Sequence, residues 1–122
     1  MSARVLFLDD EEPMCELLSG YFREKGFGVA TATTGRRAVE LASQQRFDLA
    51  VFDIHVANEN GLELLSYFRT NFPNVPVIML TGMVGGDDLI EQARLRGASG
   101  FMRKTDPLDD LFSSLKAYLP AA

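Results

Sequence analysis

The chain has 122 residues, of which 47% are hydrophobic and 24% are charged, and its formal net charge is −5. These values describe one globular domain, and they exclude a disordered protein and argue against binding to a nucleic-acid backbone. The single cysteine allows no internal disulfide, and the chain has neither a signal-peptide pattern nor an apolar run near the ~20 residues of a membrane span, so we expect a cytoplasmic protein away from the membrane.

Five short apolar runs follow one another along the chain, each with a helical pattern after it. They predict strands at residues 5–8, 29–32, 47–52, 77–80 and 100–103. The central run ends abruptly in one carboxylate, Asp53, shortly before the turn-prone residues Asn58 to Gly61. This pattern indicates a buried central strand with an acid at its carboxyl end.

The segments between these runs have apolar residues at helical spacing. Pro13 and Pro107 are suited to open helices, Thr34 to cap one, and Gly26 and Gly97 to end two. The apolar stripes are Met14, Leu17, Leu18, Tyr21 and Phe22; Ala38, Leu41 and Ala42; Leu64, Leu65, Phe68 and Phe72; Leu89, Ile90 and Ala93; and Leu108, Leu111, Phe112, Leu115, Tyr118 and Leu119. Five βα units predict a doubly wound α/β fold, in which a parallel five-stranded sheet carries five helices on its two faces.

Polar side chains stand where four of these strands end. Asp9 and Asp10 follow the first strand, Asp53 the third, Thr81 the fourth and Lys104 the fifth. In a flavodoxin-like sheet of order 2-1-3-4-5 these ends share one edge, at the switch point where ligands bind. Three carboxylates, a hydroxyl and an amine are therefore expected to converge. Taken alone, the paired acids could simply favour a helix N-terminus through its dipole.

Such a cluster has a chemical consequence. Clustered carboxylates repel, so either their pKa values rise or a cation enters, and an all-oxygen site suits Mg²⁺ or Mn²⁺. Charges of −3 from the acids, +2 from the metal and +1 from Lys104 would sum to about zero and admit an anionic phosphoryl group. Because a carboxylate can accept a phosphoryl group covalently, the pattern predicts an aspartyl phosphate at Asp53.

Over residues 1–122 the chain resembles the response-regulator receiver domain of two-component signalling. The resemblance is carried by Asp9-Asp10, Asp53, Thr81-Gly82, and Gly97 to Phe101 with Lys104. It implies a phosphorylation-activated switch, in which Asp53 accepts phosphate from a histidine kinase or a histidine phosphotransfer protein. It implies no conventional multi-turnover enzyme, because such a domain catalyses its own phosphorylation and dephosphorylation.

The resemblance also implies a metal site. Asp10 and Asp53 would bind Mg²⁺ directly, Asp9 would bind it largely through water, and the backbone carbonyl of His55 would be a further ligand. The His55 side chain itself is expected to face solvent.

The resemblance further implies a switch. Thr81 and Lys104 would contact the phosphoryl oxygens, and Phe101 would change rotamer together with Thr81. The surface of the fourth helix, fifth strand and fifth helix would then change and act on a downstream protein or an attached effector domain. Phe101 could also be plain core, and Cys15 is expected to be a small buried or half-buried residue without a role.

The sequence departs from the family pattern at several positions. Val56-Ala57 replaces the common Met-Pro, and Asn60 replaces an Asp before the loop glycine. Thr105 follows Lys104 where many receivers have a cis proline, so we expect a trans bond there. Gly100 stands where receivers that form symmetric dimers carry an Asp, so we expect a mostly monomeric domain that binds no DNA, either free-standing or cut from a longer protein.

Three other classes are compatible with parts of the pattern. A pseudo-receiver would bind partners without being phosphorylated, although it would normally lack one of the five site residues. A haloacid-dehalogenase-type phosphatase needs a second acid two residues after its nucleophile, and His55 occupies that position. A flavodoxin-like mononucleotide binder needs a Gly/Ser/Thr-rich loop after the first strand, where this chain is acidic.

Overall fold

The computed structural model describes residues 3–54, 61–82 and 87–119. Within them lies one parallel sheet of five strands in the order β2-β1-β3-β4-β5, which confirms the predicted topology. The strands are β1 (Arg4–Leu8), β2 (Gly28–Ala32), β3 (Leu49–Asp53), β4 (Val77–Thr81) and β5 (Gly100–Arg103). The side chain of His55 was predicted to be solvent-facing and its carbonyl to be a metal ligand, but His55 lies outside the described residues.

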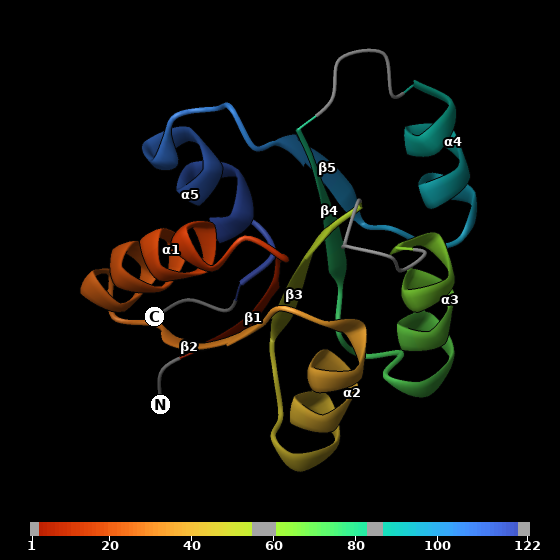
Figure 1. Ribbon diagram of the computed structural model, residues 1–122, viewed down its shortest axis with the longest axis horizontal. Coiled ribbons are helices and arrows are strands. Elements are labelled where there is room, and N and C mark those ends of the chain that lie inside the picture. The colour runs from red at the N-terminus through yellow and green to blue at the C-terminus, as the bar shows by residue number, and fades with distance from the viewer. Residues whose placement is uncertain (1–2, 55–60, 83–86, 120–122) are drawn as a thin grey trace.

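Five helices cover the two faces of the sheet. They are α1 (Glu12–Glu24), α2 (Gly35–Gln44), α3 (Gly61–Asn71), α4 (Asp87–Leu95) and α5 (Leu108–Lys116). Figure 1 shows α1 and α5 on one face of the sheet, and α2, α3 and α4 on the other. Each face therefore has its own apolar core, and both cores share the sheet.

The central strand β3 is buried along its whole length, between β1 on one side and β4 on the other. Because side chains alternate along a strand, Val51 packs in the core under α1 and α5, whereas Phe52 packs in the core under α2, α3 and α4. The two flanking strands hold Asp53 at the edge of the sheet, where only 3% of its surface is exposed.

The predicted helix signals act as expected at three places. The Thr34 side chain caps α2 by accepting a hydrogen bond from the backbone N–H of Arg37 at 3.2 Å. Gly26 and Gly97, which follow α1 and α4, have φ values of 93° and 103°, a region that glycine adopts without steric cost. These short signals fix where α2 begins and where α1 and α4 end.

Two details of the predicted helix faces are wrong. Leu17 is 52% exposed, because the buried side of α1 is formed by Cys15, Leu18 and Phe22 instead. The last helix ends at Lys116, before the predicted Tyr118, whose hydroxyl reaches back to donate to the Ser99 carbonyl at 3.1 Å. Among the described residues, no helix is long and apolar enough to cross a lipid bilayer.

Candidate functional site

Three acidic side chains meet at the carboxyl edge of the sheet, as predicted. Asp9 and Asp10 follow β1, and Asp53 ends the neighbouring strand β3. One carboxylate oxygen from each of the three lies within 4.8 Å of the others. Asp9 and Asp53 are buried and Asp10 is half-buried, so water screens their mutual repulsion only in part.

The amine of Lys104 lies among these carboxylates. Its Nζ atom is 2.8 Å from Asp9 Oδ2 and 3.0 Å from Asp53 Oδ2. The backbone of Lys104 is fixed as well, because its N–H donates to the carbonyl of Thr81 at 2.9 Å. The end of β4 thus positions the lysine that follows β5, and the side chain is left only 14% exposed.

A further acid, Glu11, joins the cluster, and sequence reasoning did not identify it as a site residue. Its Oε1 atom lies 3.0 Å from Lys104 Nζ, although 67% of its side chain is exposed. The run of acids after β1 contained the signal, but nothing in the sequence told which of those acids point inward. The backbone decides this, because the N–H of Glu11 donates to Asp9 Oδ1 at 2.9 Å and turns the chain.

The acids and the lysine shift one another's pKa values. Burial raises the pKa of Asp9, and the contact with Lys104 and a hydrogen bond from the Glu11 backbone offset this only in part. Burial alone would lower the pKa of Lys104, but its contacts with Asp9, Glu11 and Asp53 raise it above the ordinary value. The lysine is therefore positively charged at neutral pH, whereas burial makes the ionised form of Asp9 less favourable.

The donor set fits a hard divalent cation. Asp9 Oδ2 is buried and, within the described residues, has no hydrogen-bond partner of good geometry despite its short distance to Lys104 Nζ. The carboxylate oxygens of Asp9, Asp10 and Asp53 are close enough to share one ion. All-oxygen sets of this kind suit Mg²⁺ or Mn²⁺, and a divalent charge would relieve the repulsion that burial imposes on these acids.

The two residues of the predicted switch lie on β4, which neighbours the acid-bearing strand β3, and on β5, the next strand outward. Thr81 is buried at the end of β4 and pairs in register with Arg103 of β5. Phe101 is half-buried and packs against the core under α2, α3 and α4. The Lys104–Thr105 bond is trans, as expected, since the described chain has no cis peptide bond.

The carboxyl edge of the sheet that carries Asp9, Asp10, Asp53 and Lys104 is called the acid edge below. Next to Asp53 it also has a close backbone contact. Gly61 begins α3 against the strand end, and a Cβ atom at that position would lie 2.5 Å from the carbonyl oxygen of Ile54. Any larger residue would push α3 away from the end of β3. Glycine is therefore required where the chain returns beside the acceptor strand.

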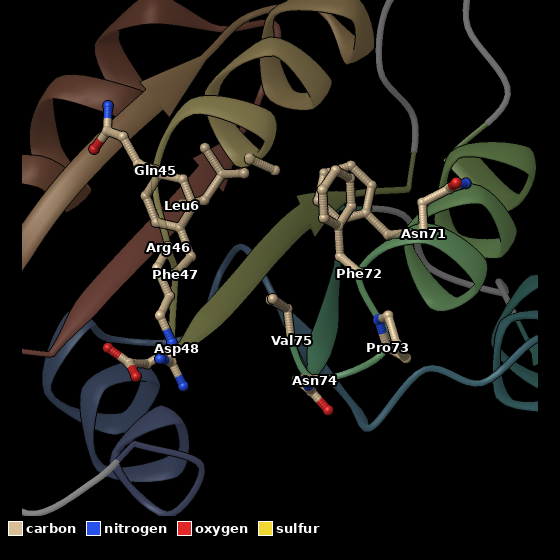
Figure 2. A pocket seen from close by; sticks show the side chains of 12 residues that line it. Leu6, Gln45, Arg46, Phe47, Asp48, Asn71, Phe72, Pro73, Asn74 and Val75 are labelled. Atoms are coloured by element: carbon tan, nitrogen blue, oxygen red, sulfur yellow. The ribbon is translucent and has the colours of Figure 1, made fainter.

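A cavity of about 430 Å³ opens at the opposite edge of the sheet, beside the amino ends of β3 and β4. Figure 2 shows Phe47 and Asp48 on one side of it and Phe72 to Val75 on the other. None of the clustered acids or Lys104 lines this cavity. The chemistry of the acid edge is therefore separate from the cavity.

In a comparison with protein families, residues 5–116 match the family described as "Response regulator receiver domain". Among curated relatives, the sporulation initiation phosphotransferase F of Bacillus subtilis is 28% identical over 120 residues, which cover 98% of this chain and 96% of the relative. The transcriptional regulatory protein ZraR of Escherichia coli is 32% identical over 118 residues, 97% of this chain. This chain spans only 26% of the length of that regulator.

Solved structures with the same fold include the chemotaxis protein CheY4 of Vibrio cholerae. Its TM-score to this chain is 0.90 at 26% sequence identity, and the match covers 98% of this chain and all of that one (100%). The overall fold described above thus recurs in a protein of known structure over nearly the whole length of the chain.

Proposed function

The chain belongs to the response regulator receiver domain family, and from that premise we propose that it is a switch controlled by phosphorylation of Asp53. The observation that carries this proposal is the position of the Lys104 amine, 3.0 Å from a buried Asp53 oxygen and 2.8 Å from Asp9. Fixed positive charge where the phosphoryl oxygens will lie stabilises the charge of a phosphoryl group as a carboxylate accepts it.

In the proposed reaction, an Asp53 carboxylate oxygen attacks the phosphorus of the donor. The new oxygen–phosphorus bond forms as the bond to the donor's leaving group breaks, and the leaving group departs with the electron pair. Lys104 stays protonated, because its pKa is raised, and its amine donates to the phosphoryl oxygens. Asp9, Asp10 and Asp53 would hold Mg²⁺, which supplies positive charge to the phosphoryl oxygens when it is bound.

Intact-protein mass tests this proposal. Wild type incubated with acetyl phosphate and Mg²⁺ should gain one phosphoryl group, and Asp53→Asn should gain none. Asp48→Asn, an acid of the same strand region at the other edge, is the matched control and should gain the group normally. A wild-type chain that is folded but gains no phosphoryl group would instead favour a pseudo-receiver.

The proposed switch couples this site to the surface formed by α4, β5 and α5. A dianionic phosphoryl group replaces the single charge of Asp53, so the Thr81 hydroxyl is drawn inward as a donor. The movement makes room beside β5, and Phe101 turns from its half-buried position into that space. A bias of ~1–3 kcal/mol on this surface would be typical of allosteric coupling.

The variant Thr81→Ala tests the switch separately from the chemistry. It should accept a phosphoryl group, yet show little change in amide chemical shifts on β5 and α5. A phosphorylated variant with shift changes like those of wild type would contradict the role of Thr81. Thr70→Ala, on the exposed end of α3, controls for the loss of a threonine elsewhere.

The partners proposed for this domain follow from the family. Receiver domains take their phosphoryl group from histidine kinases or phosphotransfer proteins, and they act on effector domains or on separate proteins. One relative is named as a phosphotransferase and another as a transcriptional regulatory protein. We assign this chain to the same kind of relay, with protein contacts as its output.

A further inference from the structure

Glu11 makes a contact that the proposed reaction does not use. Three carboxylates surround the amine of Lys104, at 2.8 Å for Asp9, 3.0 Å for Glu11 and 3.0 Å for Asp53. Asp9 and Asp53 are buried, whereas 67% of the Glu11 side chain is exposed. Glu11 is therefore the partner of Lys104 that water can most readily replace.

The backbone of Glu11 is fixed while its side chain is free to choose a partner. Its N–H donates to Asp9 Oδ1, and its carbonyl accepts from the N–H groups of Met14 and Cys15. Glu11 is the N-cap residue of α1, yet its side chain makes no capping hydrogen bond and reaches Lys104 instead. The chain thus holds an exposed carboxylate at the rim of the acid edge.

Glu11 and a phosphoryl group on Asp53 would both need the Lys104 amine, and their negative charges would repel each other. The Lys104 ammonium donates hydrogen bonds to Glu11 and Asp53 and forms an ion pair with Asp9, so three carboxylates share its three N–H groups in the resting domain. A phosphoryl group on Asp53 needs donors from the same amine, and it brings two negative charges toward the Glu11 carboxylate. Glu11 must then leave Lys104 and turn into water, which its exposed position permits.

Building on the function proposed above, we propose that Glu11 is a positioning residue that competes with the phosphoryl group for Lys104. It holds the amine in the resting domain and opposes occupation of the site by a tetrahedral oxyanion at Asp53. Glu11→Gln should therefore favour the phosphoryl-bound state by about two- to fivefold, the range expected on removing an exposed ion-pair partner.

The resting contact is tested first, in metal-free protein without any phosphodonor. The chain has only three lysines, Lys25, Lys104 and Lys116, so ¹⁵Nζ spectra of lysine-labelled protein are simple to assign by single Lys→Arg substitutions. Glu11→Gln should shift the Lys104 signal and leave the other two in place. The control is Glu12→Gln, which removes the same charge from the neighbouring exposed residue of α1 and should leave Lys104 unchanged.

The competition is tested with beryllofluoride, an oxyanion-like mimic of the phosphoryl group, in the presence of Mg²⁺. Its apparent affinity, read from amide shifts near Asp53, should be about two- to fivefold higher for Glu11→Gln than for wild type or Glu12→Gln. Equal affinities of all three proteins would overturn the inference, and so would weaker binding by Glu11→Gln, which would make Glu11 a helper in cation binding.

The two proposals fail in different ways. The proposed function fails if wild type does not bind beryllofluoride, or if Asp53→Asn binds it equally well. The proposed competition by Glu11 then fails as well. If wild type binds and Asp53→Asn does not, the function stands. The comparison of Glu11→Gln with Glu12→Gln then decides the role of Glu11 alone.

Discussion

The aspartates at the two ends of the central strand β3 have different kinds of partner. Asp48 directly precedes β3, and its carboxylate accepts the backbone N–H of Arg4 at 2.8 Å, while its own N–H donates to the Arg4 carbonyl at 2.8 Å. Asp53 ends the strand among Asp9, Asp10 and Lys104. Asp48 fastens β3 to β1, whereas Asp53 lies where like charges gather. The partners of a carboxylate at a strand end thus decide whether it joins two strands or belongs to a charged cluster.

The largest effect expected from this comparison is protection by Mg²⁺. At 100 times its dissociation constant, a ligand of the folded state raises the free energy of unfolding by about 2.7 kcal/mol. Wild type and Asp48→Ala should gain this protection equally, although Asp48→Ala starts about 1 kcal/mol lower because the Arg4 N–H loses its acceptor. Asp10→Asn should gain little. Urea unfolding with Mg²⁺ or with a chelator measures this, and full protection of Asp10→Asn would place the ion elsewhere.

The second effect concerns the backbone beside Asp53. Gly61→Ala should destabilise the protein by about 1–3 kcal/mol, because its Cβ would overlap the Ile54 carbonyl. Gly20→Ala is the matched control, since a Cβ there meets no atom within 4 Å. It should stabilise α1 by about 0.5–1 kcal/mol. Thermal unfolding of both variants measures the pair, and equal stabilities would show that the carboxyl edge tolerates a side chain at Gly61.

The third effect is a pH dependence of the metal-free protein. Burial raises the folded pKa of Asp9 above its ordinary value of 3.8, so the contribution of this group to stability is present below that value and is lost as pH rises through the folded pKa. Asp9→Asn should therefore gain stability relative to wild type between acidic and neutral pH. Unfolding in chelator at an acidic and at a neutral pH measures the stability of both proteins. A loss of stability of Asp9→Asn relative to wild type on going to neutral pH would contradict the expected sign.

The smallest effect lies away from both edges, between α1 and α5. The Tyr21 hydroxyl donates to Asp109, and this hydrogen bond raises the pKa of Tyr21 to about 12. Its contribution to stability is present below the ordinary value of 10.0 and is lost as pH rises through about 12. In an absorbance titration Asp109→Asn should return this tyrosine toward its ordinary value, whereas the exposed neighbour Asp110→Asn should not. An unchanged titration in Asp109→Asn would exclude the contact.

Much of this comparison could be predicted from the sequence. Apolar periodicity predicted the strands and helices, and the doubly wound fold that five βα units favour predicted the strand order. The acid that ends the central run is predicted to be the acceptor because Asp9, Asp10, Thr81 and Lys104 also follow strands of the same sheet. These are long-range consequences of a regular topology, in which parallel strand ends must share an edge.

Other features could not be predicted because they depend on side-chain direction. Glu11 and Glu12 are adjacent acids in the sequence, yet of these two only Glu11 forms an ion pair with Lys104 among the described residues. Leu17 carries an apolar side chain at helical spacing, but the rotation of α1 leaves it exposed. Apolar periodicity predicts the buried side of a helix only to within one turn, and tertiary packing decides which side chains on that turn are buried.

The most direct test of Asp53 as the acceptor locates the phosphoryl group on one of the two aspartates. Borohydride reduces an acyl phosphate of aspartate to homoserine, which marks the acceptor permanently. Trypsin leaves Asp48 and Asp53 in the same peptide, since no lysine or arginine lies between Arg46 and Arg69, so fragmentation of that peptide by mass spectrometry compares the two acids in one molecule. We expect homoserine at position 53 alone, and homoserine at position 48, or in the peptide that carries Asp9 and Asp10, would contradict phosphorylation of Asp53.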